Sequence, residues 1–287
     1  MIDLQIHSTF SDGSLTPTEL VKEAKAKGLS AIALTDHDTI DGLPEFMAAG
    51  KKDGVITVPG VEISVDIKLP NHGHMHILGL FINPYDKDLK SKLEFLRTER
   101  NKRAEKIIQK LNDLGLKVTL EELLAEAGEG SIGRPHIAKI MLRRGFVSTI
   151  QEAFNLYLGK GKPAYVDKVK FGEEEAIKMI KNANGLTILA HPHLMKYDSL
   201  QETQEKILAL KTYGLDGLET YYSTMTEEYS QALVKFAQEN QLVISGGSDY
   251  HGNNKDGIFM GIVDGQRNIP DSVYHNLKKY WERQNRR

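Results

Sequence analysis

Residues 33–42 read ALTDHDTIDG, an apolar run that ends directly in the ionisable triplet Asp36, His37 and Asp38. Residues 31–35 form a short apolar segment of the kind that predicts a buried strand. The same arrangement recurs along the chain, where His7 follows an extended run and His191 ends the segment TILAHP. A chain that repeatedly places such side chains at the ends of buried strands predicts an α/β fold with a site at one edge of its sheet.

Strand and helix signals alternate on both sides of this stretch. Strands are expected at residues 4–7, 31–35, 55–58, 75–82, 186–190, 217–221 and 242–245, and helices at 17–28, 173–182, 200–213 and 227–239. Strands that alternate with helices indicate parallel βαβ units. About seven units favour a closed barrel over an open sheet, and no glycine-rich dinucleotide fingerprint follows the first strand.

A helical region interrupts this alternation. Residues 89–114 form a long charged helical pattern that ends at Gly115, and short helical pieces continue to about residue 158. We therefore expect an inserted helical, substrate-capping subdomain at 97–167, inside a barrel built from 1–96 and 168–287.

The composition excludes several classes of protein. The chain has 287 residues, 40% hydrophobic and 26% charged, and 37 basic against 39 acidic residues give a net charge of −2. This balance provides no overall basic field for binding long DNA. The absence of cysteine excludes disulfides and thiolate metal sites. No segment approaches the ~20 apolar residues of a membrane span, so a cytoplasmic protein without membrane contact is expected.

The ionisable residues near strand ends are the strongest functional signal. In a (β/α) barrel, the carboxyl ends of the strands meet at one mouth, where active sites lie. A single histidine there is usually a hydrogen-bonded wall residue, but chance does not explain a whole set of them. Imidazole and carboxylate together suit Zn²⁺, Mn²⁺ or Fe²⁺. The set comprises His7, Asp12, Asp36, His37, Asp38, Glu62, His76, His191, Asp249 and His251.

Six ordered motifs carry a resemblance to a known family. DLQIHSTFSDG, ALTDHDTIDG, PGVEIS, HILGL, LAHP and GSDYHG resemble, in order and spacing, those of the PHP (polymerase and histidinol phosphatase) family, over almost the whole chain. The similarity is greatest to the branch of nucleoside 3′,5′-bisphosphate phosphatases and 5′→3′ exoribonucleases. That branch also has a helical insertion. The stretches GRPHIAK and GKGKPAYV of this chain resemble the motifs of that insertion.

The resemblance implies a distorted (β/α)7 TIM-like barrel with two or three divalent metal ions per chain, as Mn²⁺, Zn²⁺, Fe²⁺ or Mg²⁺. The implied ligand groups are His7, Glu62 and Asp249 for one ion, Glu62, His76 and His191 for a second, and Asp12, His37 and His251 for a third. A carboxylate shared by two ions, such as Glu62, holds them close while offsetting their repulsion.

One position departs from the family pattern. The first strand of the family carries His-x-His, and this chain has Gln5 at the first of these positions. A glutamine offers only a neutral amide oxygen, which is a poor ligand for a transition metal. The group of His7, Glu62 and Asp249 is therefore expected to bind its ion more weakly, or to bind a harder ion such as Mn²⁺ or Mg²⁺.

Further residues are expected to act beyond the metal ligands. Asp36 and Asp38 either orient a ligand imidazole or stabilise the turn. His193 either protonates the leaving oxygen or simply binds phosphate, and the alternative to both is a solvated loop residue. Arg134, His136, Lys160 and Lys162 are candidates for gripping a second phosphate, and the alternative is a helix start and a basic linker. His72 and His74 match no family motif and are not expected to be ligands, and His275 is expected at the surface.

The leading hypothesis is a metal-dependent phosphoesterase that attacks a nucleotide phosphoester with a metal-bridging hydroxide. Its expected substrate is a 3′,5′-bisphosphonucleotide or the 5′ end of a short oligoribonucleotide. Three alternatives stay open: a catalytically weakened PHP scaffold that binds a ligand or regulates a partner, a histidinol-phosphate-type phosphatase, and an amidohydrolase. The last expects a carboxylated lysine at a strand end, which this chain lacks at a matching position. The sequence does not indicate an oligomeric state.

Overall fold

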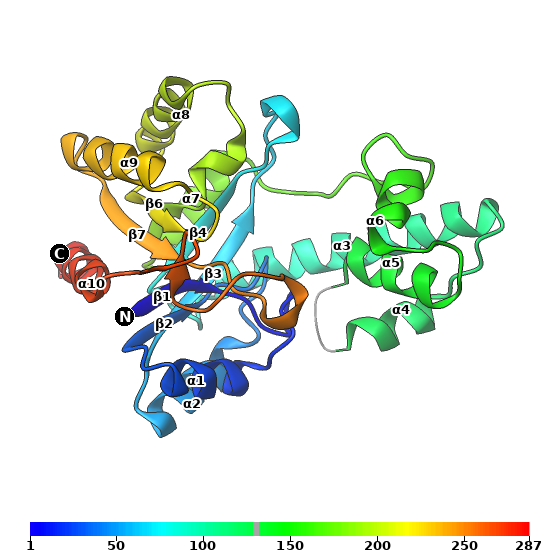
Figure 1. Ribbon diagram of the computed structural model, residues 1–287, viewed down its shortest axis with the longest axis horizontal. Coiled ribbons are helices and arrows are strands. Elements are labelled where there is room, and N and C mark those ends of the chain that lie inside the picture. The colour runs from blue at the N-terminus through cyan, green and yellow to red at the C-terminus, as the bar shows by residue number, and fades with distance from the viewer. Residues whose placement is uncertain (129–131, 287) are drawn as a thin grey trace. The chain divides into compact units, whose positions relative to one another are not determined.

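The chain divides into two compact units. The computed structural model describes residues 1–128 and 132–286. One unit comprises Met1–Leu93 and Lys170–Arg287, and the other comprises Glu94–Val169. The second unit covers the region in which the sequence predicts a helical insertion (Figure 1).

The first unit is a barrel of seven strands, and each strand is hydrogen-bonded to its neighbours in chain order. The apolar runs that predict strands line its interior and the layer between sheet and helices, with Leu4, Ala33, Leu78 and Ile188 fully buried in one cluster. The strands are β1 (Ile2–Ile6), β2 (Ala31–Leu34), β3 (Ile56–Ser64), β4 (His76–Leu80), β5 (Leu186–Leu189), β6 (Gly217–Tyr222) and β7 (Val243–Gly247). The predicted distorted (β/α)7 barrel is confirmed.

The barrel closes where β1 meets β7 and the residues that follow it. The backbone N–H of Asp249 donates to the carbonyl of Gln5 at 3.0 Å, and that of His7 donates to Tyr250 at 2.9 Å. Gly247 permits this approach, because a β-carbon there would lie 2.3 Å from the β-carbon of Gln5. The closure therefore sets the end of β1 beside the loop after β7.

The expectation of parallel pairing throughout is wrong at β4. This strand pairs antiparallel with both β3 and β5. The link between β3 and β4 contains only the short 3-10 helix η1 (Pro70–His72), whereas a parallel return needs a crossover of a dozen or more residues. Because β4 is reversed, its first residue, His76, lies opposite Ser64 at the end of β3. The start of β4 thus belongs to the same mouth as the ends of the parallel strands.

Helices cover the outside of the barrel. Helix α1 begins with a capping box, in which the side chain of Thr16 accepts from the N–H of Glu19. The covering helices are α1 (Pro17–Ala26), α2 (Leu43–Asp53), α7 (Glu173–Asn182), α8 (Leu200–Thr212), α9 (Glu227–Glu239) and α10 (Asp271–Asn285). Short elements complete the loops at the strand ends: η3 (Pro192–Met195), η4 (Gly252–Asn254) and the ribbon of β8 (Ile262–Val263) and β9 (Arg267–Asn268).

The second unit is helical and has its own core. Helix α3 (Lys87–Asp113) runs into it from the first unit and buries Ile107 and Leu111 against Leu123, Ile137 and Ile140. The other helices are α4 (Leu120–Ala127), α5 (Arg134–Arg143), α6 (Ile150–Ala153) and the π-helical turn η2 (Phe154–Leu158). Among the described residues, no helix is both long and apolar enough to cross a membrane.

Candidate metal centre

The structure brings all eight predicted metal ligands together at the mouth of the barrel. Each follows from where its strand ends: His7 and Asp12 come after β1, and His37 comes after β2. Glu62 lies near the end of β3, His76 begins β4, His191 follows β5, and Asp249 and His251 follow β7. Among the described residues, four groups hold ligand atoms within 4.8 Å of one another: His7, Asp12, His37 and His251; His37, Glu62 and His76; His7, Glu62 and Asp249; and His74, His76 and His191.

Glu62 is the centre of this cluster. Its Oε1 lies 2.7 Å from Nδ1 of His76 and 3.0 Å from Nε2 of His191. Its Oε2 lies 3.1 Å from Nε2 of His7 and 3.2 Å from Nδ1 of His37. The side chain is fully buried. A single carboxylate therefore faces four imidazoles, with each oxygen directed to a different pair.

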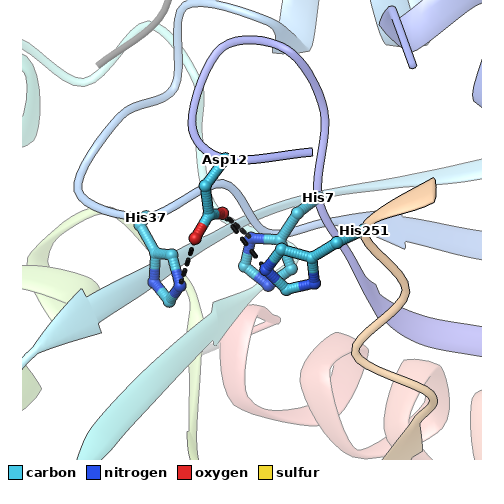
Figure 2. A group of neighbouring side chains, drawn as sticks. All are labelled: His7, Asp12, His37 and His251. Carbon is cyan, nitrogen blue, oxygen red and sulfur yellow. Dashed lines mark ion pairs between the residues drawn. The ribbon is translucent and has the colours of Figure 1, made fainter. Parts of the chain in front are cut away.

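Asp12 occupies the outer side of the cluster. Figure 2 shows its carboxylate between His37 and the stacked rings of His7 and His251, whose centroids are 4.2 Å apart. One oxygen lies 3.1 Å from Nε2 of His251, and the other lies 3.8 Å from Nε2 of His37. This is the third ligand group implied by the resemblance, with His7 adjacent to it.

Several atoms of the cluster are buried without a hydrogen bond. Such orphaned polar groups are rare in native proteins, and they often mark the place of a bound ion or water. Imidazole nitrogens and carboxylate oxygens are the donors that divalent transition metals take. The residues present therefore fit a metal cluster. Of the buried atoms without a hydrogen bond among the described residues, those on the predicted ligands are Nε2 of His7, Nδ1 of His37, Oε2 of Glu62, Nδ1 of His191 and Nε2 of His251.

The protonation states of the cluster differ from one ligand to the next. Burial opposes the ionisation of Glu62, but the imidazoles around it, His37 foremost, hold its pKa well below the usual range. Burial likewise opposes ionisation of Asp12, while His37 and His251 hold its pKa well below normal. Burial lowers the pKa of His37 to about 3. Glu62 and Asp12 are thus ionised and His37 is neutral, the forms in which both bind metals. Burial opposes the protonation of His7, but Asp249 and Glu62 raise its pKa well above normal, so His7 must lose a proton to bind a metal.

Gln5 acts as a hydrogen-bond donor in the structure. Its amide Nε2 donates to Oε1 of Glu62 at 3.2 Å. Its Oε1 is buried and has no hydrogen-bond partner within residues 1–128 and 132–286. Gln5 therefore orients the shared carboxylate from the position at which the family pattern has a histidine.

Tyr222 and Lys255 support Asp249, and sequence reasoning missed both. The hydroxyl of Tyr222 donates to Oδ2 of Asp249 at 2.7 Å, and Lys255 pairs with the same oxygen. The other oxygen, Oδ1, lies 3.1 Å from Nε2 of His7. Tyr222 sits opposite Gly247 in the β6–β7 pairing, a relation that no sequence motif reveals.

Asp36 and Asp38 hold the loops that carry the ligands. Asp36 accepts from the backbone N–H of Ser8 at 2.7 Å and from the hydroxyl of Ser11 at 2.5 Å. The hydroxyl of Ser11 also lies 3.5 Å from Nδ1 of His7, so Asp36 reaches a ligand imidazole only through Ser11. Asp38 accepts from the N–H of Ser64 at 3.0 Å. Both carboxylates therefore hydrogen-bond to backbone beside the ligands: Asp36 to Ser8 after β1, and Asp38 to Ser64 at the end of β3.

His193 lies beside the cluster, in η3. Its Nε2 is 3.0 Å from the hydroxyl of Thr224, and its ring centroid is 5.2 Å from that of Tyr222. Burial, reinforced by His191, lowers the pKa of His193 to about 4. The ring is therefore neutral at pH 7.

The predicted phosphate-binding residues lie in the second unit. Arg134 donates to the carbonyl of Leu158 at 2.9 Å, and its guanidinium lies over the rings of Phe154 and Tyr165 at 5.6 and 5.5 Å. Nδ1 of His136 accepts from the backbone N–H of Gly133 at 3.2 Å, which caps α5. Lys160 and Lys162 are exposed. Burial, followed by the charge of Arg134, lowers the pKa of Arg103 to about 10.

His74 is absent from the ligand set expected from the sequence, and the structure places it in the cluster. Its ring centroid lies 5.2 Å from that of His76 and 5.4 Å from that of His191, and the three offer ligand atoms within 4.8 Å of one another. The available signal is its position two residues before His76. Side chains two apart on extended chain point to the same side.

Comparison with known proteins agrees with this geometry. The model of the PHP domain matches residues 3–248. The chain belongs to the PHP domain family. A 5′-3′ exoribonuclease of Haemophilus influenzae is 37% identical over 250 residues, which cover 87% of this chain and 89% of that protein. A 3′,5′-nucleoside bisphosphate phosphatase of Chromobacterium violaceum is 32% identical over 279 residues, 96% of each chain.

Solved structures show the same likeness. A candidate metal-dependent phosphoesterase of Bifidobacterium adolescentis is 28% identical, with a TM-score of 0.81 over 96% of this chain and 94% of that one. A Chromobacterium violaceum protein described as an amidohydrolase, with bound sulfate and no metal, is 30% identical, with a TM-score of 0.80 over 97% of this chain and 96% of that one. The predicted class, a metal-dependent phosphoesterase of the PHP family, is confirmed by these relatives.

Proposed function

We propose that this PHP protein hydrolyses a phosphoester of a small nucleotide, either a nucleoside 3′,5′-bisphosphate or the 5′ end of a short RNA. The observation that carries the proposal is the set of eight imidazole and carboxylate side chains, Glu62 among them, at one barrel mouth. The two relatives whose names give these substrates each match at least 87% of this chain. A cytoplasmic location is part of the same proposal.

Two or three divalent ions are proposed to bind this cluster, in the ligand groups that the family resemblance implies. When bound, such ions activate water and neutralise charge on the phosphoryl oxygens. Glu62 contributes one oxygen to the side of His7 and His37, and the other to the side of His76 and His191. Tyr222 and Lys255 fix Asp249 so that its free oxygen faces His7.

His193 is proposed to serve the leaving group. A ring that is neutral at pH 7 must gain a proton before it can donate one, and the negative charge of a phosphate bound beside it would raise its pKa. His193→Gln keeps a hydrogen-bonding side chain but cannot transfer the proton. We expect kcat to fall roughly 10²–10⁴-fold for a substrate with a poor leaving group. The loss should be much smaller for an aryl phosphate, whose leaving oxygen needs no proton.

The second unit is proposed to hold the remote end of the substrate through Arg134, His136, Lys160 and Lys162. A guanidinium binds phosphate through two parallel hydrogen bonds, which an ammonium cannot reproduce. Arg134→Lys should therefore raise KM for a bisphosphate while kcat changes little. A monophosphate substrate, which lacks the remote phosphate, should show a smaller change in KM.

Gln5 favours one other function, a scaffold that binds ligands without catalysis. A chain that has lost its metals would hydrolyse no phosphoester, whichever ion were supplied. The two functions therefore differ in a single measurement of activity after metal loading.

The experiment uses adenosine 3′,5′-bisphosphate, a 5′-phosphorylated oligoribonucleotide, histidinol phosphate and an aryl phosphate. Each is offered with Mn²⁺, Zn²⁺, Mg²⁺ or a chelator. We expect nucleotide hydrolysis that requires metal and falls roughly 10²–10³-fold in Glu62→Gln. His275→Gln, in the exposed part of α10, is the matched control. Preference for histidinol phosphate, or no turnover with any ion, would refute the proposal.

A further inference from the structure

His74 and His76 flank Met75 at the start of β4. Met75 is buried in the barrel, and its two neighbours face the mouth. This is the two-residue alternation of an extended chain. His74 therefore presents its imidazole on the same side as the ligand His76.

The backbone that carries His74 is held firmly against the loop after β5. The N–H of His74 donates to the carbonyl of Leu194 at 3.0 Å, and Asn71 donates to the carbonyl of Lys196 at 3.1 Å. Between them, a β-carbon on Gly73 would lie 2.0 Å from the carbonyl oxygen of Met195. The contact is close enough that only glycine fits. It fixes the segment of His74 beside the segment of His191.

The three rings surround one point. Their centroids are separated by 5.2 Å for His74 and His76, 5.4 Å for His74 and His191, and 5.1 Å for His76 and His191. Zn–N bonds of about 2.0–2.1 Å in a tetrahedral site place two nitrogen ligands about 3.3 Å apart. The ligand atoms of the three histidines already lie within 4.8 Å of one another. For the three nitrogens to bind one zinc ion, side-chain rotation must bring them from within 4.8 Å to about 3.3 Å of one another.

The shared carboxylate also points to a ligand. Glu62 adds a carboxylate oxygen next to both His76 and His191.

We propose that His74 is a direct ligand of the metal ion held by His76 and His191, forming a three-imidazole site that prefers Zn²⁺ to Mn²⁺ or Mg²⁺. Imidazole-rich sites suit zinc, while carboxylate and water suit the harder ions. Gln5 strengthens the case, because its amide donates a hydrogen bond to Oε1 of Glu62, the oxygen that faces His76 and His191. This hydrogen bond leaves Oε1 less available to the ion, and the imidazole of His74 supplies a further ligand. The inference rests on the proposed function only in taking the cluster as a metal centre.

The test is zinc affinity of the metal-free full chain, measured by competition with a chromogenic chelator. His74→Gln removes the imidazole and keeps a polar side chain. His72→Gln, in the exposed turn η1, is the matched control. We expect one Zn²⁺ to bind at least tenfold more weakly in His74→Gln and within twofold of wild type in His72→Gln. Mn²⁺ affinity should change much less. Equal zinc affinity in His74→Gln and wild type would overturn the proposal.

A second measurement uses the unaltered protein and does not depend on a variant folding. In ¹⁵N-histidine spectra, addition of Zn²⁺ should shift one ring nitrogen of His74 together with those of His76 and His191. An unmoved His74 signal would also overturn the proposal. Failure of the proposed function gives a different pattern, in which zinc binds with His74 as a ligand but no phosphoester is hydrolysed.

Discussion

Replacing Gln5 by histidine tests how far one residue limits the metal centre. The amide nitrogen of Gln5 already reaches Oε1 of Glu62, at 3.2 Å. Nε2 of a histidine is the same number of bonds from the β-carbon, so an imidazole at this position reaches the same region. The backbone stays fixed because β7 packs directly on it at Gly247. The amide oxygen of Gln5 has no partner among the described residues, so its removal leaves no donor unsatisfied.

The expected gain is in metal affinity. The group of His7, Glu62 and Asp249 has one imidazole and two carboxylates, with Nε2 of His7 lying 3.1 Å from an oxygen of each. Even indirect partners of metal ligands change affinity about 10–100-fold. A second imidazole should strengthen binding at this group by at least that factor, which corresponds to about 1.4–2.7 kcal/mol.

The assay is calorimetric titration of metal-free wild type and Gln5→His with Mn²⁺. Wild type should show one class of site distinctly weaker than the rest, and Gln5→His should convert it to tight binding. Gln5→Asn keeps an amide on a shorter side chain and serves as the control, with no gain expected. If wild type and Gln5→His bind every ion equally well, Gln5 does not weaken the centre and the reasoning fails.

Three other perturbations follow from the structure. Tyr222→Phe removes the hydrogen bond to Asp249 and should weaken metal binding roughly 10–100-fold in the same titration, with the apo fold retained. Asp216→Ala removes a buried carboxylate that accepts a hydrogen bond from Lys181 at 2.6 Å. Urea unfolding should show that the free energy of unfolding falls by about 3 kcal/mol, the low end for a broken buried pair, because Lys181 reaches solvent. Burial raises the pKa of Asp3 from 3.8 to about 6. The contribution of Asp3 to the free energy of unfolding is therefore greatest below pH 3.8 and is lost as the pH rises through 6. The slope of unfolding free energy over that range should flatten in Asp3→Asn, and an unchanged slope would contradict the assignment.

Most of the metal ligands were predictable because they lie where a strand signal ends. His76 is the exception, because it lies at the start of its predicted strand. On a parallel strand this place would put it at the opposite end of the barrel from Glu62. The reversal of β4 resolves this, since it sets His76 opposite Ser64 at the mouth. Strand direction depends on the length of the connection and on pairing with β5, which a local pattern does not contain.

The sequence did not predict the residues that act through tertiary contacts. Tyr222 reaches Asp249 because β6 and β7 are paired, and Lys255 reaches it because the loop after β7 folds back. His74 needed the contact of its backbone with the loop after β5. Arg134 shows the converse. Its motif predicts phosphate binding, while the rings of Phe154 and Tyr165 beneath it become visible only in the fold.

The cluster itself argues against a metal-free scaffold. Five of its ligand atoms are buried without a hydrogen bond in the described structure. Nε2 of His7 lies 3.1 Å from Oε2 of Glu62, and Nδ1 of His37 lies 3.2 Å from the same oxygen, so these donor atoms converge on one place. A metal ion bound there would satisfy them together. Gln5 does not alter this arrangement, because it donates to Oε1 of Glu62 and leaves Oε2 directed to His7 and His37. The substitution therefore weakens one ligand group while preserving the orientation of the carboxylate that joins the others.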